Sequence, residues 1–358
     1  MKHAYVFYRY PYADTFTVMR QYSGTPKELC SFNCMAGHEG YVFAPFKASD
    51  KNPILLIEPD EIETRHVNNA SFFSENEFQV RDIDTEYELY INNFNLFHDK
   101  LIDGSFDKIV LSRRSVERSY ESIDPELLFM RACSLYPRMF IALIHTPQSG
   151  MWLTATPEIL IESANEQLHT MAIAGTMKLS DTDTDISLKE RKDSLDISEW
   201  GRKDKREQHY VAKYIKDCLG DFSDSIVDYG PYTLRAGMVK HLATDFFLTL
   251  ADNKDLGNLV NELHPTPAVC GAPKMPTYKF IIENEACERE YYSGFSGPLN
   301  CDEGTHFYVT LRCMKIEDTV FSLYAGGGLL SDSDGRSEWF ETEAKMETMR
   351  KCLAIKRI

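Results

Sequence analysis

The stretch Tyr324–Met349 constrains the fold of this chain more than any other. An apolar run that ends at Tyr324 is typical of a strand, and three consecutive glycines follow it at 326–328. The sequence SDSDG at 331–335 then predicts a turn, and a helical pattern begins near Ser337. We therefore expect a strand, a glycine bend and a helix. The glycines would let the backbone approach a bound group closely.

Two acids and a lysine fall on one side of the predicted helix. With 3.6 residues per turn, Glu338, Glu341 and Lys345 share a stripe. The neighbouring stripe is apolar and consists of Trp339, Met346, Met349 and Leu353. The two carboxylates therefore lie beside the buried seam, whereas Glu343 falls on the outer face, where an acid is simply solvated. This arrangement indicates a site for an anion together with a cation.

A second helix, predicted from about Asp196 to Leu219, has the same property. Asp204 and Glu207 stand three residues apart and border its apolar stripe. Four inward carboxylates from two helices suit a hard divalent cation such as Mg²⁺, which takes oxygen ligands. Either pair alone is more often part of a solvated helix face. The acidic stretch Asp181–Asp193 before this helix is expected to be an exposed loop or a helix start.

Two further residues have environments that favour their neutral forms. Ile109, Val110 and Leu111 predict a strand buried on both faces, and Lys108 enters it, so its amine would be partly desolvated and a possible base. The alternative is a lysine whose head group reaches water. Glu158 lies between a Thr-Pro turn and an apolar strand, which would raise its pKa, although it equally fits an acid that caps a turn.

Composition narrows the class of protein. The net charge of −16 argues against a nucleic acid or an anionic membrane surface as partner. The nine cysteines form no C-x-x-C pair, which is typical of reduced thiols in the cytoplasm. We expect no leader peptide and no membrane segment, since no apolar run approaches membrane length.

The motifs follow one another in an order that resembles the chorismate-utilising enzymes. They are Lys108–Arg113, Pro157–Leu160, Ala172–Thr176, Glu207, His241-Leu242, His264–Ala268, Arg312 and Ala325–Lys345. Over about residues 96–352 the chain is similar to the isochorismate synthases of menaquinone and siderophore synthesis. The resemblance implies an α+β fold like that of anthranilate synthase component I, with two packed antiparallel β-sheets flanked by helices. It also implies a single large domain, 1–358, in which 1–95 form a variable N-terminal part.

The resemblance also implies roles for the residues that form these motifs. Lys108 matches the general base that activates water for attack at C2 of chorismate, and Glu158 matches the acid that protonates the departing C4 hydroxyl. Glu207 and Glu338 match ligands of Mg²⁺, with Asp204 and Glu341 as additional or water-mediated partners. The implied enzyme is an isomerase that acts on chorismate, works as a monomer and needs no glutamine amidotransferase subunit.

The remaining matched positions would contact the substrate. Those implied for the pyruvyl-ether carboxylate are Tyr292, Arg312, Gly326 and Gly328, and the others are Gly175, Thr176, His241, Ala268 and Lys345. We expect Arg312 on the face of a strand at 307–313, where its fork matches a carboxylate. His241, beside an apolar run, could donate a hydrogen bond to an anion.

Three positions distinguish this chain from related enzymes. Anthranilate synthases usually have glutamine at the position of Lys108, and aminodeoxychorismate synthases usually have a nucleophilic lysine at that of Ala174. Salicylate synthases, which also eliminate pyruvate, often have threonine at that of Ala268. These residues favour isochorismate synthesis, with salicylate synthesis, an amine-adding enzyme and a non-catalytic anion-binding homologue as alternatives. The chain departs from the family pattern at Gln208, commonly histidine, and at Asp204, commonly glutamate.

Overall fold

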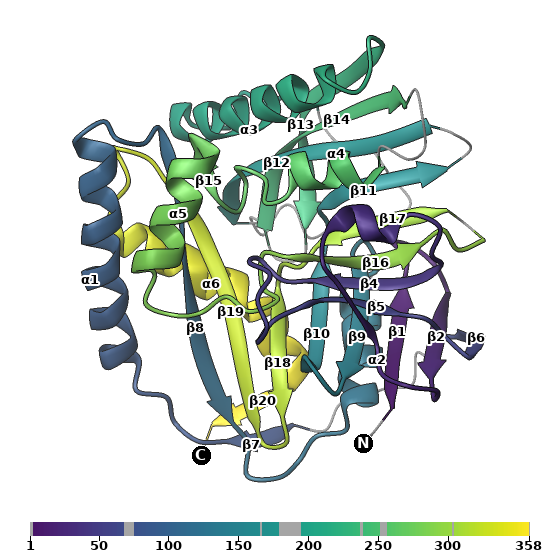
Figure 1. The fold of residues 1–358 in the computed structure, drawn as a ribbon. Helices are drawn as coiled ribbons and strands as arrows, with labels where there is room; N and C mark the ends of the chain where they lie inside the picture. Colours follow the sequence, from purple (N-terminus) through teal and green to yellow (C-terminus); the bar gives the residue numbers. More distant parts are fainter. Residues whose placement is uncertain are drawn as a thin grey trace.

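Two large antiparallel sheets dominate the computed structural model, which describes residues 3–67, 75–164, 167–178, 195–236, 239–250, 256–302 and 304–357 (Figure 1). The first sheet has nine strands in the order β15 (Gly271–Ala272), β8 (Lys108–Arg118), β19 (Val320–Leu329), β18 (Cys313–Glu317), β10 (Gly150–Thr156), β9 (Phe140–Thr146), β1 (Ala4–Arg9), β2 (Thr15–Gln21) and β6 (Glu61–His66). The second also has nine, in the order β13 (Ile226–Ala236), β14 (Val239–Thr249), β12 (Gln167–Lys178), β11 (Ile159–Ala164), β17 (Thr305–Val309), β16 (Phe295–Leu299), β4 (Gly40–Ala44), β5 (Ile54–Ile57) and β3 (Lys27–Leu29).

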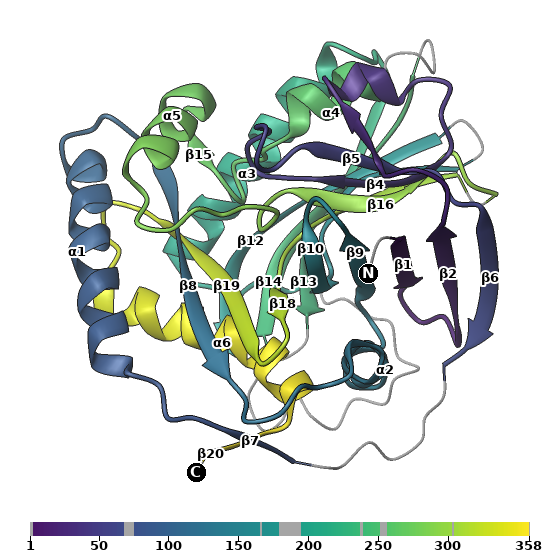
Figure 2. The same cartoon turned by 60° about the horizontal axis from the view of Figure 1, so that its bottom comes forward.

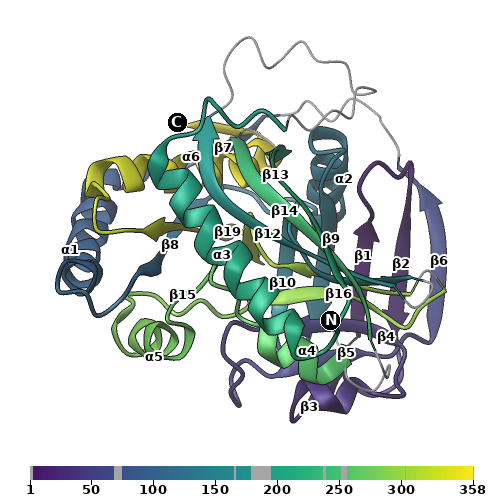
Figure 3. The same cartoon turned by 90° about the horizontal axis from the view of Figure 1, so that it is seen from above.

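Helices cover the outer faces of the two sheets. They are α1 (Ile83–Ile102), α2 (Pro125–Leu135), α3 (Arg202–Gly220), α4 (Leu256–Leu263), α5 (Lys274–Asn284) and α6 (Gly335–Leu353), with the short 3₁₀ helix η1 (Phe32–Met35). Figure 3 shows α3 lying across the strands β12 and β14 of the second sheet. A small parallel pair, β7 (Asn76–Phe78) and β20 (Ile355–Arg357), completes the described elements. The predicted fold class is confirmed.

The pleat of β9 explains how the layers pack. Phe140, Ala142 and Ile144 point into the core between the two sheets, whereas Ile141 and Leu143 point into a second core under α2 and α6. Successive side chains of a strand face opposite sides, so a strand that is apolar at every position is buried on both. Across the first core, Phe140 stacks on Tyr308 of β17 with ring centroids 4.1 Å apart.

The N-terminal region supplies strands to both sheets. β1 pairs with β9, and β4 pairs with β16, so residues before 67 extend each sheet at one end (Figure 2). These hydrogen bonds join the N-terminal part to strands of the motif-bearing region. The expectation of one domain over 1–358 stays a prediction.

The element that begins at β19 follows the sequence pattern in part. Helix α6 is capped by Asp334, whose side chain accepts a hydrogen bond of 2.9 Å from Ser337 N, and its predicted apolar stripe is buried. The expected glycine bend is wrong, because β19 continues straight through the glycines and pairs with β8 as far as Leu329. Glu343 is also misplaced by the pattern: it forms ion pairs with Arg81, Arg113 and Arg350.

The expected helix at 196–219 corresponds to α3, which begins later, at Arg202. The acidic stretch Asp181–Asp193 lies outside the described residues. None of the helices described combines the length and the apolar character needed to cross a membrane.

Candidate active site

A pocket of about 520 Å³ lies where the C-terminal part of β12 and the start of β14 meet β8, β19 and α6. Every residue predicted to contact the substrate lines it. These are Gly175, Thr176, His241, Ala268, Tyr292, Arg312, Gly326, Gly328 and Lys345. Glu158 and Glu207 line it as well, and apolar side chains such as Val110, Ile173 and Leu311 complete the wall. The structure therefore brings together motifs that are spread over more than two hundred positions.

Arg312 reaches the pocket from a crossover rather than from a strand. The chain leaves the second sheet at Val309 and enters the first at Cys313, so the expected single strand 307–313 is wrong. Arg312 turns this corner with φ +42°, in the left-handed region. Its side chain is buried, and its Nε has no hydrogen-bond partner. A buried guanidinium with an open donor fits an anionic ligand.

His241 holds Arg312 instead of donating to an anion. Its Nδ1 lies 2.7 Å from the carbonyl oxygen of Gly175, and its Nε2 lies 2.9 Å from Arg312 Nη2. Burial, reinforced by the charges of Arg312 and Lys345, lowers the pKa of His241 to about 3. The neutral ring thus donates from Nδ1 and accepts at Nε2, so no ring N–H remains for a ligand.

Glu158 is buried in the turn between β10 and β11. Both main-chain polar groups of Glu158 are hydrogen-bonded: its N–H donates to Thr156 Oγ1 at 3.2 Å, and its carbonyl accepts from Val309 N at 2.9 Å. Burial raises the pKa of its carboxyl to about 7, against the opposing charges of Arg312, Lys108 and Lys345. A carboxylic acid that keeps its proton near neutral pH can act as a proton donor.

Lys108 is fully buried at the start of β8. Its Nζ lies 3.0 Å from Glu207 Oε1, but the angles are not those of a hydrogen bond, and the amine has no other partner. It lies directly behind the pocket wall, because a Cβ on Gly328 would come within 2.8 Å of Lys108 Cε. The side chain is therefore adjacent to the pocket without lining it.

The glycines of β19 leave room for the acids above the strand. A Cβ on Gly328 would lie 2.1 Å from Glu207 Oε1, and one on Gly327 would lie 3.0 Å from Glu338 Oε2. Gly175, with φ +70°, places its N–H 3.0 Å from Glu207 Oε2. Three glycines thus surround the carboxylates that the sequence predicts as metal ligands.

Cations inside the protein balance these carboxylates. Glu338 pairs with Lys203, and Glu341 Oε1 lies 2.7 Å from Lys345 Nζ. Burial disfavours the charged form of Lys203, but Glu338, Glu341 and Glu207 outweigh it and raise the pKa of this lysine. The position of Lys203 among three acids was not predicted. Its spacing of four residues from Glu207 on α3 was the available signal.

The carboxylates predicted to bind the metal differ in how far nearby positive charges compensate their negative charge. Burial and repulsion from Glu341 raise the pKa of Glu338 to about 7, and burial together with Glu207 raises that of Asp204 above its ordinary value. Burial opposes ionisation of Glu341, but Lys345 outweighs it and lowers the pKa. Glu338 Oε2 is buried without a hydrogen-bond partner. An open carboxylate oxygen among mutually repelling acids is the donor chemistry of a divalent cation.

Within the described part of the chain, no group of three or more His, Cys, Asp or Glu side chains is arranged ready to hold a metal ion. The lysines account for this, because they pair with three of the four predicted ligands. The donor set fits Mg²⁺ chemically, and Lys203 would have to release Glu338 to it.

Gln208 is one of the positions where the chain departs from the family pattern. Its side chain donates to Ala172 O at 3.2 Å and Thr244 Oγ1 at 3.1 Å, which fixes α3 on the sheet.

Known proteins are similar to this chain in sequence and in fold. Residues 49–354 match a family model described as chorismate binding enzyme. Isochorismate synthase EntC of Escherichia coli K12 is 29% identical over 244 residues, which cover 68% of this chain, and the chain spans only 61% of that relative. DhbC of Bacillus subtilis, also an isochorismate synthase, is 28% identical over 76% of this chain and 69% of its own length. The solved structure of the menaquinone-specific isochorismate synthase MenF of Escherichia coli shares the fold, with a TM-score of 0.79 at 21% identity over 98% of this chain and 88% of that one.

Proposed function

Since the chain belongs to the chorismate-binding enzyme family, we propose that it is an isochorismate synthase. In this reaction water adds at C2 of chorismate, the ring double bonds shift, and the C4 hydroxyl departs as water. The observation that carries the proposal is one pocket that combines a buried arginine with an open donor and a buried glutamic acid of raised pKa. A dicarboxylate and a leaving hydroxyl need these two groups together.

Recognition of the substrate would rest on buried cations. Arg312, oriented by His241, offers its free Nε–H to a carboxylate, and Lys345 reaches the pocket from α6. Charge-assisted hydrogen bonds in a buried site are stronger than those at a surface, so two carboxylates would be held firmly. Tyr292 and the glycines of β19 would form the remaining wall around the pyruvyl-ether group.

Two residues would carry the proton transfers. Lys108 would take a proton from the attacking water, while Glu158 would give its proton to the C4 oxygen as the C–O bond breaks. The raised pKa of Glu158 supports the second role, because the acid is still protonated near neutral pH. The position of Lys108 supports the first, since its side chain is fully buried directly behind the pocket wall at Gly328.

We propose Mg²⁺ as the cofactor, held by Glu207 and Glu338 with Asp204 and Glu341 as further or water-mediated partners. When bound, the ion would neutralise the ring carboxylate and fix its orientation. The unpartnered Glu338 Oε2 and the raised pKa values of Glu338 and Asp204 support a cation here.

The pocket wall supports water rather than an amine as the nucleophile. Residue 174, where an amine-adding relative would place a nucleophilic lysine, is an alanine that lines the pocket. We also propose that the enzyme is a monomer without an amidotransferase subunit. A cytoplasmic location is supported by nine cysteines that are all unpaired thiols.

The test is to identify the products formed from chorismate and Mg²⁺, with and without ammonia. We expect isochorismate in both conditions. Lys108→Ala should form none and should still bind chorismate, as measured by calorimetry. Salicylate with pyruvate would indicate a salicylate synthase, and an aminated product that requires ammonia would indicate an amine-adding enzyme. Retained turnover of Lys108→Ala would exclude this lysine as the base.

A further inference from the structure

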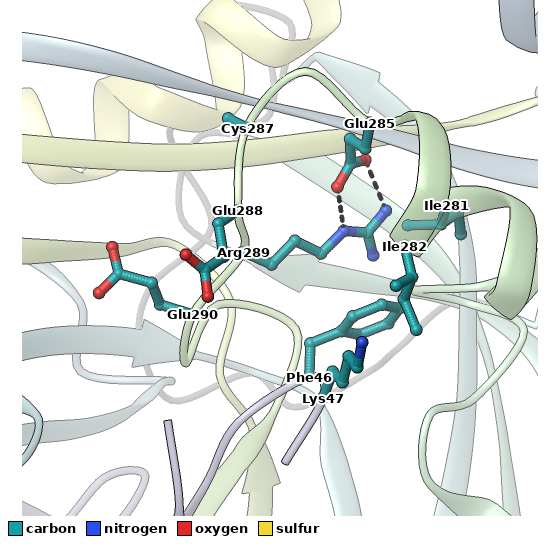
Figure 4. A pocket seen from close by; sticks show the side chains of 9 residues that line it. All are labelled: Phe46, Lys47, Ile281, Ile282, Glu285, Cys287, Glu288, Arg289 and Glu290. Carbon is teal, nitrogen blue, oxygen red and sulfur yellow. Dashed lines mark hydrogen bonds and ion pairs between the residues drawn. The ribbon is translucent and has the colours of Figure 1, made fainter. Parts of the chain in front are cut away.

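A buried ion pair lies behind the pocket wall, between Glu285 at the end of α5 and Arg289 (Figure 4). Arg289 Nε donates to Glu285 Oε2 at 2.6 Å, and Nη2 donates to Oε1 at 2.7 Å. Both side chains are only 3% exposed, and the guanidinium lies over the ring of Phe46 at 4.2 Å. A fully buried pair costs desolvation energy, so its remaining hydrogen bonds indicate what it is there to hold.

Those remaining bonds go to the two segments that form the pocket wall. Arg289 Nη2 donates to the carbonyl of Val110 in β8 at 2.9 Å, and Nη1 donates to the carbonyl of Val269 at 2.6 Å. Val110 and Val269 both line the pocket. Val110 is two residues from Lys108 on the same strand, and Val269 follows Ala268. One guanidinium thus joins the strand of the predicted base to the loop of a predicted substrate contact.

The pair covers part of the edge of β8 that extends beyond its short pairing with β15. β15 pairs with β8 only at Lys108 and Ile109. Beyond them, Val110 N donates to Cys270 O at 2.7 Å, Val110 O accepts from Arg289, and Ser112 N donates to Glu285 Oε1 at 2.7 Å. The ion pair therefore supplies two hydrogen bonds that a neighbouring strand would otherwise make, one at Val110 and one at Ser112. An uncovered edge in this place would leave the main chain next to Lys108 free to shift.

We propose that Arg289 is a positioning residue, which keeps Lys108 at its reacting distance by joining β8 to the loop at Val269. This inference rests on the proposed function. Arginine suits the role because its planar fork makes four hydrogen bonds at fixed angles, whereas a lysine amine cannot span the same partners. On its other edge β8 pairs with β19, and Val110 N bonds to Cys270 O, so Arg289 adds the link between Val110 O and Val269 O.

A surface hollow of about 630 Å³ reaches the pair from outside and is lined by Phe46, Lys47, Ile281, Glu285 and Arg289 among others (Figure 4). None of its described lining side chains has an unpartnered buried polar atom, so it points to no ligand of its own. It does offer a small cation a route to Glu285 once the arginine side chain is removed.

The experiment measures isochorismate formation by Arg289→Ala and Arg289→Lys beside the wild-type enzyme. The matched control is Arg9→Ala, because Arg9 is equally buried and donates to three main-chain carbonyls, those of Cys133, Tyr136 and Met139, far from the pocket. We expect Arg289→Ala to lose about 100-fold in kcat with KM changed less than about fivefold, since a small misplacement of a reacting group has that effect. Millimolar guanidinium chloride should raise the kcat of Arg289→Ala about tenfold, and sodium chloride at equal concentration should leave it unchanged.

Arg289→Lys keeps the positive charge but lacks the planar guanidinium, so it tests the proposal even if Arg289→Ala does not fold. It should fold and lose at least about tenfold in kcat. Three results would overturn the proposal. The first is a wild-type kcat in Arg289→Lys, and the second is an equal loss of kcat per folded molecule in Arg289→Ala and Arg9→Ala. The third is a loss of kcat in Arg289→Ala that guanidinium does not restore. Wild-type enzyme that makes no isochorismate would instead overturn the proposed function, and this inference with it.

Discussion

Glu158 and Glu162 lie four residues apart, in the turn before β11 and on β11 itself, and their surroundings give them opposite ionisation states. Glu158 is buried without a hydrogen-bonded cation, and burial raises its pKa to about 7. Burial also opposes ionisation of Glu162, but hydrogen bonds from His169, His306 and Tyr308 outweigh it and hold its pKa far below the usual range. Of the two, only Glu158 has a proton to give near neutral pH, which is why the pocket needs that carboxyl unpaired.

Glu158→Gln should therefore lower kcat about 10²- to 10⁴-fold, because glutamine cannot donate a proton of comparable acidity. In the wild-type enzyme, kcat/KM should fall as pH rises through about 7, where the acid loses its proton. The variant should lack this alkaline decline. Steady-state rates of isochorismate formation between pH 6 and 9 provide the measurement. An alkaline decline that persists in Glu158→Gln would assign it to another group.

The residues of the pocket could be predicted because each lies in a distinct local motif. Lys203 and Arg289 were not predicted, since each stands directly between two charged residues, as on any solvated surface. What distinguishes them is tertiary: three acids from two helices surround Lys203, and two main-chain carbonyls from distant segments meet at Arg289. His241 was predicted to be in the site, but its donor role was not correct, because its tautomer depends on Gly175 and Arg312.

At the scale of elements, β19 and α6 act together. The strand runs beneath the acids without side chains at 326–328, and the helix that follows returns Glu338, Glu341 and Lys345 over it. The sequence predicts both elements and the stripe on α6. It does not predict that the strand stays straight, because glycine alone does not distinguish a bend from a close approach.

Gly328→Ala tests this arrangement. The new Cβ would lie 2.1 Å from Glu207 Oε1, so the Glu207 carboxylate and Lys108 would have to move. We expect kcat to fall about 100-fold and the free energy of unfolding to fall by about 1–3 kcal/mol. Gly220→Ala is the matched control, since no atom lies within 4 Å of its Cβ and α3 tolerates alanine there. Kinetics and thermal unfolding measure both effects, and wild-type kcat in Gly328→Ala would show that the acids need not sit close to β19.

Metal removal tests the joint role of α3 and α6. Activity should disappear in EDTA and return with Mg²⁺, because the charge of the ring carboxylate would otherwise stay uncompensated. Glu338→Gln should weaken the binding of Mn²⁺, measured by electron paramagnetic resonance, at least about tenfold. Glu347→Gln, on the same helix but exposed, should bind as the wild type does. A turnover rate that EDTA leaves unchanged would remove the carboxylates from the mechanism as metal ligands.

At the scale of the whole molecule, the N-terminal strands are the part that sequence patterns describe least. Burial largely alternates along β2, whereas β4 and β5 are buried throughout and β1 at all but one position, which identifies strands but not partners. Their partners β9 and β16 lie more than a hundred residues away, and such non-local pairing follows from tertiary packing rather than local pattern. The resemblance therefore specified the fold class, while the ends of both sheets became visible only in the structure.

The second sheet is held by a histidine between two acids. His169 on β12 contacts Glu162 of β11 at 3.2 Å and Asp245 of β14 at 2.9 Å. Burial opposes its charge, but these acids outweigh it and raise the pKa of His169 to about 9. Because the folded pKa exceeds the unfolded value of about 6.5, this stabilisation is complete below pH 6.5 and is lost as pH rises through 9.

His169→Gln should therefore lower the free energy of unfolding by about 2–3 kcal/mol near pH 6, because it removes the cation that bridges two half-buried acids. The deficit should shrink toward pH 10, where the wild-type histidine is itself neutral. Urea unfolding at pH 6, 8 and 10 measures the difference, with His98→Gln as control, since the half-buried His98 on α1 bonds to the carbonyl of Ser331 and stacks on Phe94 instead of bridging two acids. A deficit that stays constant over this range would mean that the His169 side chain stabilises the sheet by packing and neutral hydrogen bonds, and that its charge contributes nothing.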